Sequence, residues 1–287
     1  MIHSRRLVVI TGATRGLGRL IADRFLAAGD DLVLVARNEA DLTKTAEDLS
    51  CGAREHQNIH FFAADLSYLA AIPELIVKIQ NKAGDPDIVI NNAAIQGPIG
   101  PVYVNDWNEW QACLNVCLLA PVQFTRGFLR GMIRKKYGRI VNISGGGATA
   151  PRSNFSSYAT AKCGLVRFSE TLAQEVRDYG ITVNCVAPGA MNSDLTRHII
   201  SAGIEYAGSA EFENALHLTK ENPHTENRAA DLVHFLTADA CATISGKLIS
   251  AVWDPWEKLP DAAPALMNSD VYTLRRIVPK DRNIAIE

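Results

Sequence analysis

Thr11-Gly12-Ala13-Thr14-Arg15-Gly16-Leu17-Gly18 is the stretch that decides the fold of this 287-residue chain. The apolar run 6–10 before it has the length of a strand, and residues 17–28 after it carry apolar side chains at helical spacing. The glycines therefore mark a strand-to-helix turn: Gly12 supplies backbone angles closed to other residues, Gly16 lets a ligand approach the main chain, and Gly18 lets the helix pack on the strand. Because unpaired N–H groups at a helix N-terminus favour phosphate, the turn predicts a phosphate site rather than a glycine-rich loop without a ligand.

Continuous apolar runs alternate with helical segments along most of the chain. Further strands are expected at 31–36, 59–63, 87–90, 138–143, 181–186 and 247–251, and helices at 39–49, 68–82, 106–136, 156–178 and 228–238. Strands that are apolar throughout are typical of parallel sheets covered on both faces. We therefore expect an α/β fold of Rossmann type, a doubly wound parallel sheet of about seven strands with helices on both faces and ligands beyond the strand carboxyl ends.

The sequence predicts one domain over residues 1–252 and a C-terminal extension over 253–287. Residues 190–227 interrupt the alternation after a strand end, where a loop over a substrate would lie. Their polar side chains favour a polar substrate, such as a sugar-like or cyclic polyol carbonyl: His198, Glu205, Tyr206, Glu211, His217 and His224. Prolines predict a bend of the long helix near Pro121 and an irregular extension over the surface.

Composition narrows the class of partner. The formal net charge is −2, with 29 basic and 31 acidic residues, so the chain offers no broad basic field for nucleic acid or an anionic membrane. The first six residues resemble no secretion signal, and no apolar run has the length of a membrane span, so we expect a cytoplasmic protein. The six cysteines lack metal-ligand spacing, which predicts no metal site and buried free thiols at Cys113 and Cys117.

Four motifs occur in an order and spacing that are specific when taken together: the Thr11–Gly18 turn, Asn91-Asn92-Ala93-Ala94, Tyr158-Ala-Thr-Ala-Lys162 and Pro188-Gly189. On these motifs the chain resembles the short-chain dehydrogenase/reductase family in its single-domain branch, from about Leu7 to about Ala251. The resemblance implies an NADP-dependent oxidoreductase that interconverts a carbonyl and a secondary alcohol by hydride transfer.

Tyr158 and Lys162 stand four residues apart at the start of a predicted helix, so both side chains project from one face. An ammonium beside a phenol stabilises the phenolate, and we expect it to lower the pKa of Tyr158 toward the working range. The resemblance makes Tyr158 the general acid/base, lets Lys162 also hold the nicotinamide ribose, and assigns Asn115 to a water beside that lysine. An ordinary surface Tyr/Lys pair is the alternative.

Arg37 ends the second predicted strand, where no carboxylate stands ready for a ribose 2′-hydroxyl. A guanidinium there favours a 2′-phosphate, so NADP(H) is predicted, with Arg15 as a second phosphate partner. Asp65 is expected at the adenine, although a helix N-cap role would suit it equally. The turn and the resemblance together imply further cofactor contacts from Gly12, Thr14, Gly16, Leu17, Gly18, Leu66, Asn91, Ala93, Tyr158, Lys162, Pro188, Gly189 and Ser193.

A catalytic serine normally stands thirteen residues before the tyrosine in this family, and that position is Gly145 here. Ser144 is one residue early, so it would serve only if glycines 145–147 let the backbone bulge or turn. Otherwise a glycine N–H, a water, a substrate hydroxyl or a group from residues 190–227 would hold the substrate oxygen. Retention of Asn115, Tyr158 and Lys162 favours an enzyme.

Two other functions stay open at this point. One is an epimerase or dehydratase of the same superfamily, and the other is a sensor or scaffold that binds the dinucleotide without turnover, which Gly145 would favour. The partners expected are a small carbonyl or alcohol substrate and a second copy of the chain. The family pairs the helices that carry Asn115 and Tyr158 between subunits, so a homodimer or homotetramer is predicted.

Overall fold

The computed structural model describes residues 5–221 and 225–284. Its centre is a seven-stranded sheet in the order β3-β2-β1-β4-β5-β6-β7, in which every pair of neighbours is parallel. The strands are β1 (Leu7–Thr11), β2 (Asp31–Ala36), β3 (Ile59–Ala63), β4 (Ile88–Asn91), β5 (Gly138–Ile143), β6 (Ile181–Ala187) and β7 (Leu248–Ser250). The predicted doubly wound parallel sheet is therefore confirmed.

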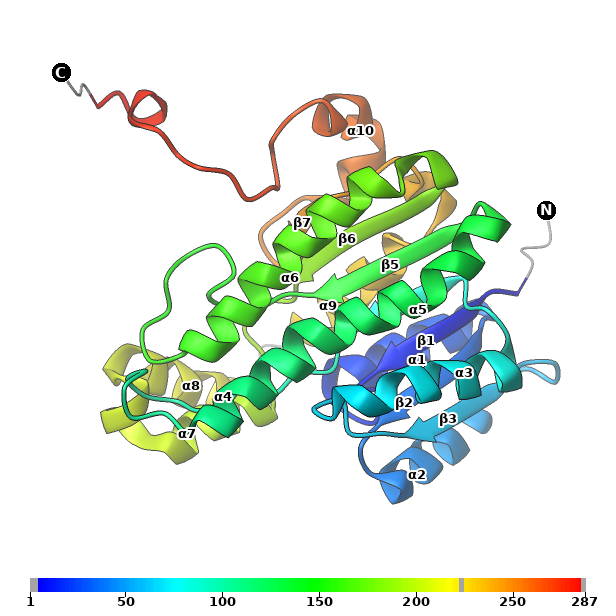
Figure 1. The fold of residues 1–287 in the computed structure, drawn as a ribbon, viewed down its shortest axis with the longest axis horizontal. Helices are drawn as coiled ribbons and strands as arrows, with labels where there is room; N and C mark the ends of the chain where they lie inside the picture. Colours follow the sequence, from blue (N-terminus) through cyan, green and yellow to red (C-terminus); the bar gives the residue numbers. More distant parts are fainter. Residues whose placement is uncertain (1–4, 222–224, 285–287) are drawn as a thin grey trace.

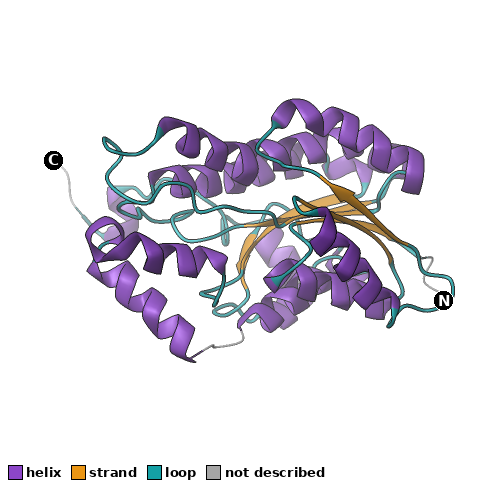
Figure 2. Cartoon of the chain, turned by 90° about the horizontal axis from the view of Figure 1, so that it is seen from below, coloured by secondary structure: helices purple, strands orange, loops and turns teal. Residues whose placement is uncertain are grey.

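Helices cover both faces of the sheet (Figures 1 and 2). One apolar layer contains residues of α1 (Gly16–Ala28), α2 (Glu39–Ser50) and α9 (Thr225–Phe235). The other contains residues of α3 (Ile72–Ala83), α5 (Ala120–Lys135) and α6 (Ser156–Glu175). Val8 belongs to the first layer and Val9 to the second, which is why the strands are apolar at every position. Short 3₁₀ turns occupy Leu69–Ala71, Arg177–Tyr179, Asp239–Cys241, Trp256–Lys258 and Pro279–Arg282.

The predicted long helix consists of α4 (Trp107–Leu114) and α5, and a π-helical turn at Asn115–Leu119 joins them into one continuous helix. Pro121 lies in the first turn of α5, where it lacks the N–H of a regular ladder. We expected a bend near Pro121. The structure instead shows a π-helical turn, in which the hydrogen-bond register of the helix changes, just before this proline. By length and composition this helix could cross a membrane, but Phe124, Phe128 and Met132 on it are fully buried in the core.

Residues 190–227 are mostly helical rather than a loop, which corrects the sequence-based expectation. They form α7 (Asp194–Ala207) and α8 (Ser209–Glu221), which lie beyond the carboxyl ends of the strands (Figure 1). Ser193 accepts the Thr196 N–H and so starts α7, and glycines with positive φ at 203 and 208 interrupt the helical path. A small apolar cluster holds the two helices together: Ile99, Phe155, Ile199, Ala207 and Ala215. His224 lies outside the described residues.

The C-terminal extension is ordered in its first half, contrary to the irregular path expected. Leu266 of α10 (Leu259–Met267) and Trp256 of the 3₁₀ turn before this helix are buried in the same apolar cluster as Val8 of β1. Pro260 occupies the first turn of α10, where a missing N–H costs little. Lys247 donates to the carbonyls of Ser269 and Val271, both at 2.9 Å, and the Leu274 N–H donates to Glu170 on α6 at 2.6 Å. The chain runs away from the body only after these contacts (Figure 1).

The strand-to-helix turn after β1 is the most tightly packed part of the fold. A Cβ added to Gly18 would lie 2.1 Å from the Gly12 carbonyl oxygen and 2.6 Å from Nδ2 of Asn92. One added to Gly12, whose φ is +67°, would lie 2.9 Å from Cα of Ala93. The neighbours of Gly18 include backbone, which cannot yield cheaply, so only glycine fits there.

Gly18→Ala is therefore expected to lower the free energy of unfolding by about 3 kcal/mol, which corresponds to a fall in Tm of roughly 6–12 °C. The matched control is Gly52→Ala, because a Cβ at Gly52 would meet nothing closer than the Leu49 carbonyl oxygen at 3.7 Å. Calorimetry of both variants checks the expectation, and equal Tm values for the two would contradict it.

Candidate active site

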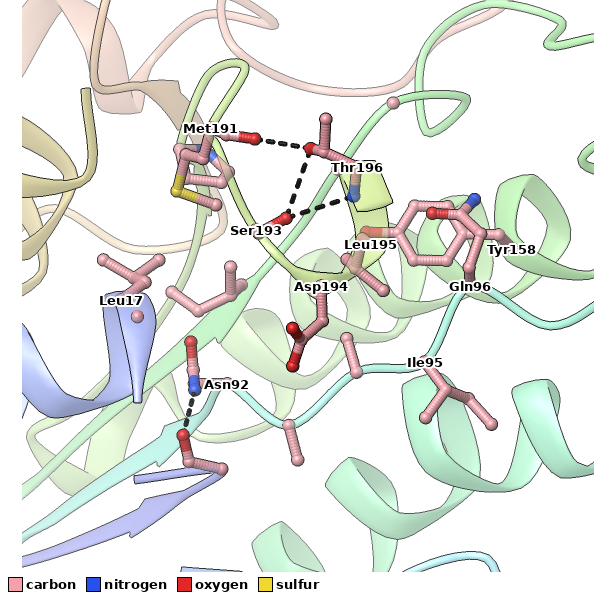
Figure 3. Close-up of a pocket in the computed structure, with 18 of the residues that line it drawn as sticks. Leu17, Asn92, Ile95, Gln96, Tyr158, Met191, Ser193, Asp194, Leu195 and Thr196 are labelled. Atoms are coloured by element: carbon pink, nitrogen blue, oxygen red, sulfur yellow. Dashed lines mark hydrogen bonds between the residues drawn. The ribbon is translucent and has the colours of Figure 1, made fainter. Parts of the chain in front are cut away.

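One cavity of about 1370 Å³ lies beyond the carboxyl ends of the central strands and reaches α7 and α8 (Figure 3). All of the predicted catalytic and cofactor residues line it except Asn91 and Asn115. Of the polar residues expected at the substrate, Glu211 lines it, whereas His198, Glu205, Tyr206 and His217 do not. They come from β1–α1, β2, the segments after β3 and β4, the end of β5, α6 and the segment after β6. The fold thus gathers residues from Gly12 to Ser193 around one space, as the order of strands in a doubly wound sheet requires.

The turn at the start of α1 has the features of a phosphate cradle. Gly16 has φ +52°, and a Cβ there would meet nothing within 4 Å, so the main chain is open to a ligand on that side. Arg15 is the N-cap of α1, and its side chain does not cap the helix, which leaves the first N–H groups of the helix available. These residues fit the diphosphate of a dinucleotide.

Two arginines border the part of the cavity next to this turn. Arg37 is exposed at the end of β2 and makes no salt bridge within residues 5–221 and 225–284. Burial acts to raise the pKa of the Asp65 carboxyl, but hydrogen bonds from Ser67 and the charge of Arg37 outweigh burial and keep this pKa below its ordinary value. Arg15 forms a salt bridge of 2.6 Å with Asp194 at the start of α7. Arg37 is thus a free cation beside the cavity, whereas Arg15 is already paired across it.

Tyr158 and Lys162 lie on the same face of α6, and both are buried. Nζ of Lys162 donates to the Ile143 carbonyl at 2.7 Å and lies 5.5 Å from the centroid of the Tyr158 ring. Burial raises the pKa of the Tyr158 phenol well above its ordinary value; interaction with Cys117 adds to this effect, and the charge of Arg152 opposes it. Our expectation that Lys162 lowers this pKa is wrong for the cofactor-free protein, because burial dominates and the ammonium is engaged by a carbonyl.

The space beside the Tyr158 hydroxyl explains the glycine at position 145. A Cβ added to Gly145 would lie 2.4 Å from Oη of Tyr158, so with this tyrosine rotamer no serine can stand there. Ser144 extends the ladder of β5, since its N–H donates to the Val186 carbonyl at 2.8 Å. Oγ of Ser144 is buried and has no hydrogen-bond partner in the part of the chain that the structure describes.

Asn91 and Asn115 lie outside the cavity and make structural hydrogen bonds. Nδ2 of Asn91 donates to Oδ1 of Asn142 on β5 at 2.7 Å. Nδ2 of Asn115 donates to the Ser67 carbonyl at 2.9 Å, and Asn115 is the first residue of the π-helical turn. In this structure both side chains join elements of the fold.

The sequence analysis missed several residues of the site. Asn92 binds the phosphate turn through bonds from Nδ2 to the carbonyls of Thr11 (2.9 Å) and Gly12 (3.1 Å), and its place in the Asn91–Ala94 motif could have revealed it. Arg152 makes two bonds of 2.7 Å to Glu211 on α8, which joins the loop after β5 to the helices over the cavity. Only tertiary structure brings these two together, so no local pattern could have predicted the pair.

Comparison with known proteins identifies the class. The family model described as short chain dehydrogenase matches residues 6–202. The chain is 30% identical over 254 residues to the 3-oxoacyl-(acyl-carrier-protein) reductase FabG of Escherichia coli (strain K12), covering 85% of this chain and 94% of that protein. FabG of Pseudomonas aeruginosa is 31% identical over 244 residues, with coverages of 85% and 94%. The chain therefore belongs to the short-chain dehydrogenase family, and it is an oxidoreductase of this family.

Solved structures share the fold over most of the chain. An actinorhodin polyketide ketoreductase variant with NADPH is 25% identical, with a TM-score of 0.76, over 86% of this chain and 95% of its own. A metagenomic short-chain oxidoreductase in complex with NADP is 27% identical, with a TM-score of 0.69 and coverages of 86% and 97%. L-sorbose reductase from Gluconobacter frateurii, complexed with NADPH and L-sorbose, is 25% identical, with a TM-score of 0.73 and coverages of 86% and 95%.

The raised pKa of Tyr158 leads to a test by titration. In the cofactor-free protein Tyr158 keeps its proton below about pH 10, the ordinary value for tyrosine, so it is a proton donor at neutral pH. Tyrosinate absorbance of the parent minus that of Tyr158→Phe should therefore show no ionisation near neutrality. Tyr103→Phe, which removes an exposed phenol, calibrates the signal of one tyrosine. A group that ionises near pH 7 and is lost only in Tyr158→Phe would overturn the assignment.

Proposed function

We propose that the protein is an NADP(H)-dependent oxidoreductase that interconverts a carbonyl and a secondary alcohol. The observation that carries this proposal is the position of the Tyr158 phenol. It lies at the carboxyl end of β5, above Gly145, in the same cavity as the N-terminus of α1. A buried proton donor is thus combined with a phosphate cradle on one wall.

Tyr158 and Lys162 divide the work in this proposal. The nicotinamide, when bound, supplies or accepts the hydride. Tyr158 gives its phenolic proton to the carbonyl oxygen in reduction and takes it back from the alcohol in oxidation. Lys162 is held in place by the Ile143 carbonyl, so its charge lies at a fixed point beneath the ring and is available to the ribose. Asn115 contributes by fixing the π-helical turn against Ser67.

NADP(H) is the cofactor in this proposal. Arg37, at the end of β2 where a 2′-phosphate would lie, forms no salt bridge with any described residue, and three of the similar solved structures named above contain NADPH or NADP. Arg15 is the second candidate for that phosphate, but it must first exchange its partner Asp194. The remaining contacts are assigned to the cavity-lining residues that the sequence predicted, from Gly12 to Ser193.

The substrate class is a polar carbonyl compound. The cavity is lined by the Arg152–Glu211 ion pair and by Asn214, which suit hydroxyl groups better than a hydrocarbon chain. L-sorbose, which is bound in one of the similar structures, is a molecule of this kind. Ketoses and cyclic polyols are therefore the first compounds to assay with NADPH and NADP⁺.

We further propose a cytoplasmic protein that self-associates. All six cysteines are free thiols, which suits a reducing compartment. The helix pair α5 and α6 lies side by side on one outer face (Figure 1), and exposed Leu119 on the helix before α5 leaves apolar surface there for a second copy. A homodimer or homotetramer through these helices is the assembly expected.

Tyr158→Phe tests the chemistry. Loss of the proton donor should reduce kcat by about 10²–10⁴-fold, while the Kd for NADPH stays at the parent value because the ring remains in place. Ser144→Ala should leave kcat close to the parent value, since the Ser144 N–H continues the ladder of β5 with no bulge that would bring its hydroxyl to the position of Gly145. Steady-state absorbance of NADPH and fluorescence titration measure the two quantities. Full activity of Tyr158→Phe would instead favour a protein that binds the dinucleotide without turnover.

Arg37→Ala tests the cofactor. One charge-assisted contact contributes roughly 1.5–3 kcal/mol, so the variant should bind NADPH about 10–150-fold more weakly and NADH unchanged. Asp194→Asn should act in the opposite direction, because it releases Arg15 for the phosphate. Arg177→Ala, at the far end of α6, is the matched control. Equal affinity of the parent protein for NADH and NADPH would rule out the preference.

A further inference from the structure

The strand end that should supply a hydroxyl to the reacting oxygen supplies none. Gly145 has no side chain, and the space of its missing Cβ is occupied by Oη of Tyr158 at 2.4 Å. Alkoxide character develops on the substrate oxygen during hydride transfer, and enzymes stabilise such charge with a fixed hydrogen-bond donor. The candidates for a second donor beside Tyr158 are the hydroxyl of Ser144, which lines the cavity one residue earlier, and a group from another element.

Gln96, five residues beyond the end of β4, has the chemistry of such a donor. It lines the cavity, its side chain is 97% buried, and it makes no hydrogen bond to any residue in the described part of the chain. Its Nε2 is shut off from solvent without a partner. Buried amides are normally satisfied, so one that is not marks a place where a ligand completes the bonding. A carboxamide also turns readily about its terminal bond, so the N–H₂ can meet an acceptor that arrives beside it.

The backbone holds Gln96 close to Tyr158. Gly97, the next residue, has φ +68°, and a Cβ there would lie 2.5 Å from Oγ of Ser157, the residue just before the tyrosine. The same Cβ would lie 2.7 Å from Cβ of Cys113 on α4. The segment is thus pressed against the start of α6. Gln96 and Tyr158 both line the cavity, and both are labelled in Figure 3.

Hydrogen bonds to Ile95, the residue before Gln96, also hold this segment in place. The Ile95 carbonyl accepts the thiols of Cys113 at 3.5 Å and Cys117 at 3.3 Å, both on the long helix. Gln96 therefore stands between two anchored residues, Ile95 and Gly97, which limits the positions that its amide can reach. Only the turn of the amide about its terminal bond is then needed to bring the N–H₂ to an acceptor.

We propose that Gln96 is a catalytic residue whose amide N–H donates to the substrate oxygen that Tyr158 protonates, replacing the hydroxyl that Gly145 lacks. In reduction the hydride adds to the carbonyl carbon, the phenolic proton of Tyr158 moves to the oxygen, and Gln96 keeps its proton throughout. This inference rests on the proposed function. The Arg152 guanidinium, the other strong donor at this end of the cavity, is already committed to Glu211 through two bonds.

The test compares three variants with the parent on the best substrate from the carbonyl panel. Gln96→Leu keeps the bulk but removes the donor, and it should lower kcat about 10²-fold while NADPH affinity and Tm stay at parent values. Gln96→Glu keeps the shape but is an acceptor when ionised. Its kcat should fall further at pH 8 and recover as the pH is lowered, because the protonated carboxyl again donates. Gln80→Leu on α3, outside the cavity, is the matched control.

The outcomes separate this inference from the proposed function. A parent that turns over no carbonyl with NADPH contradicts both. A parent that is active and loses activity in Tyr158→Phe, but keeps its kcat within a few-fold in Gln96→Leu, contradicts the role of Gln96 alone. A Gln96→Glu variant whose pH profile matches the parent also overturns it, because a purely spatial role would not respond to the carboxyl proton. A large loss in Ser144→Ala would assign the donor to Ser144 instead.

Discussion

The structure depends on a close interlock between the ends of β1 and β4. Oγ1 of Thr11 accepts the N–H groups of Asn92 and Ala93, both at 3.1 Å, and Asn92 returns bonds to the carbonyls of Thr11 and Gly12. These four hydrogen bonds hold the Gly12 carbonyl and the Asn92 side chain so close to Gly18 that no side chain fits at that position. The constraint fixes the phosphate turn relative to the segment that leads to Gln96, so both ends of the cavity are built on one rigid junction.

A buried polar chain positions α6, the helix that carries Tyr158 and Lys162, on this junction. Asn91 on β4 bonds to Asn142 on β5, and Nδ2 of Asn142 bonds to Oγ of Ser169 on α6, each at 2.7 Å. Lys162 adds a bond from α6 to the end of β5 at Ile143. Apolar packing alone would permit small slips of a helix on a sheet, whereas directional hydrogen bonds between the three side chains favour one position. Tyr158 is therefore aimed by residues that never meet the substrate.

Local sequence patterns predicted much of this arrangement and failed where distant residues decide it. The strands, the phosphate turn and the place of Tyr158 followed from apolar runs, glycines and spacing, because these act within a few residues. Helices α7 and α8 were not predicted because Gly203 and Gly208 interrupt the helical pattern and because the two helices gain apolar partners from distant Phe155 and Ile99. The pKa of Tyr158 was predicted in the wrong direction, since burial and the engagement of Lys162 are tertiary properties.

The docking of α10 has a consequence for the synthesis of the protein. Leu266 and Trp256 complete a layer that begins with Val8, and Arg6 at the start of β1 donates to the Thr237 carbonyl at 3.0 Å. While the chain emerges from the ribosome, this apolar layer stays incomplete until α9, Trp256 and α10 have been made. Such a nascent chain exposes apolar surface for most of its translation, which makes it a natural client for chaperones and leaves little tolerance for premature termination.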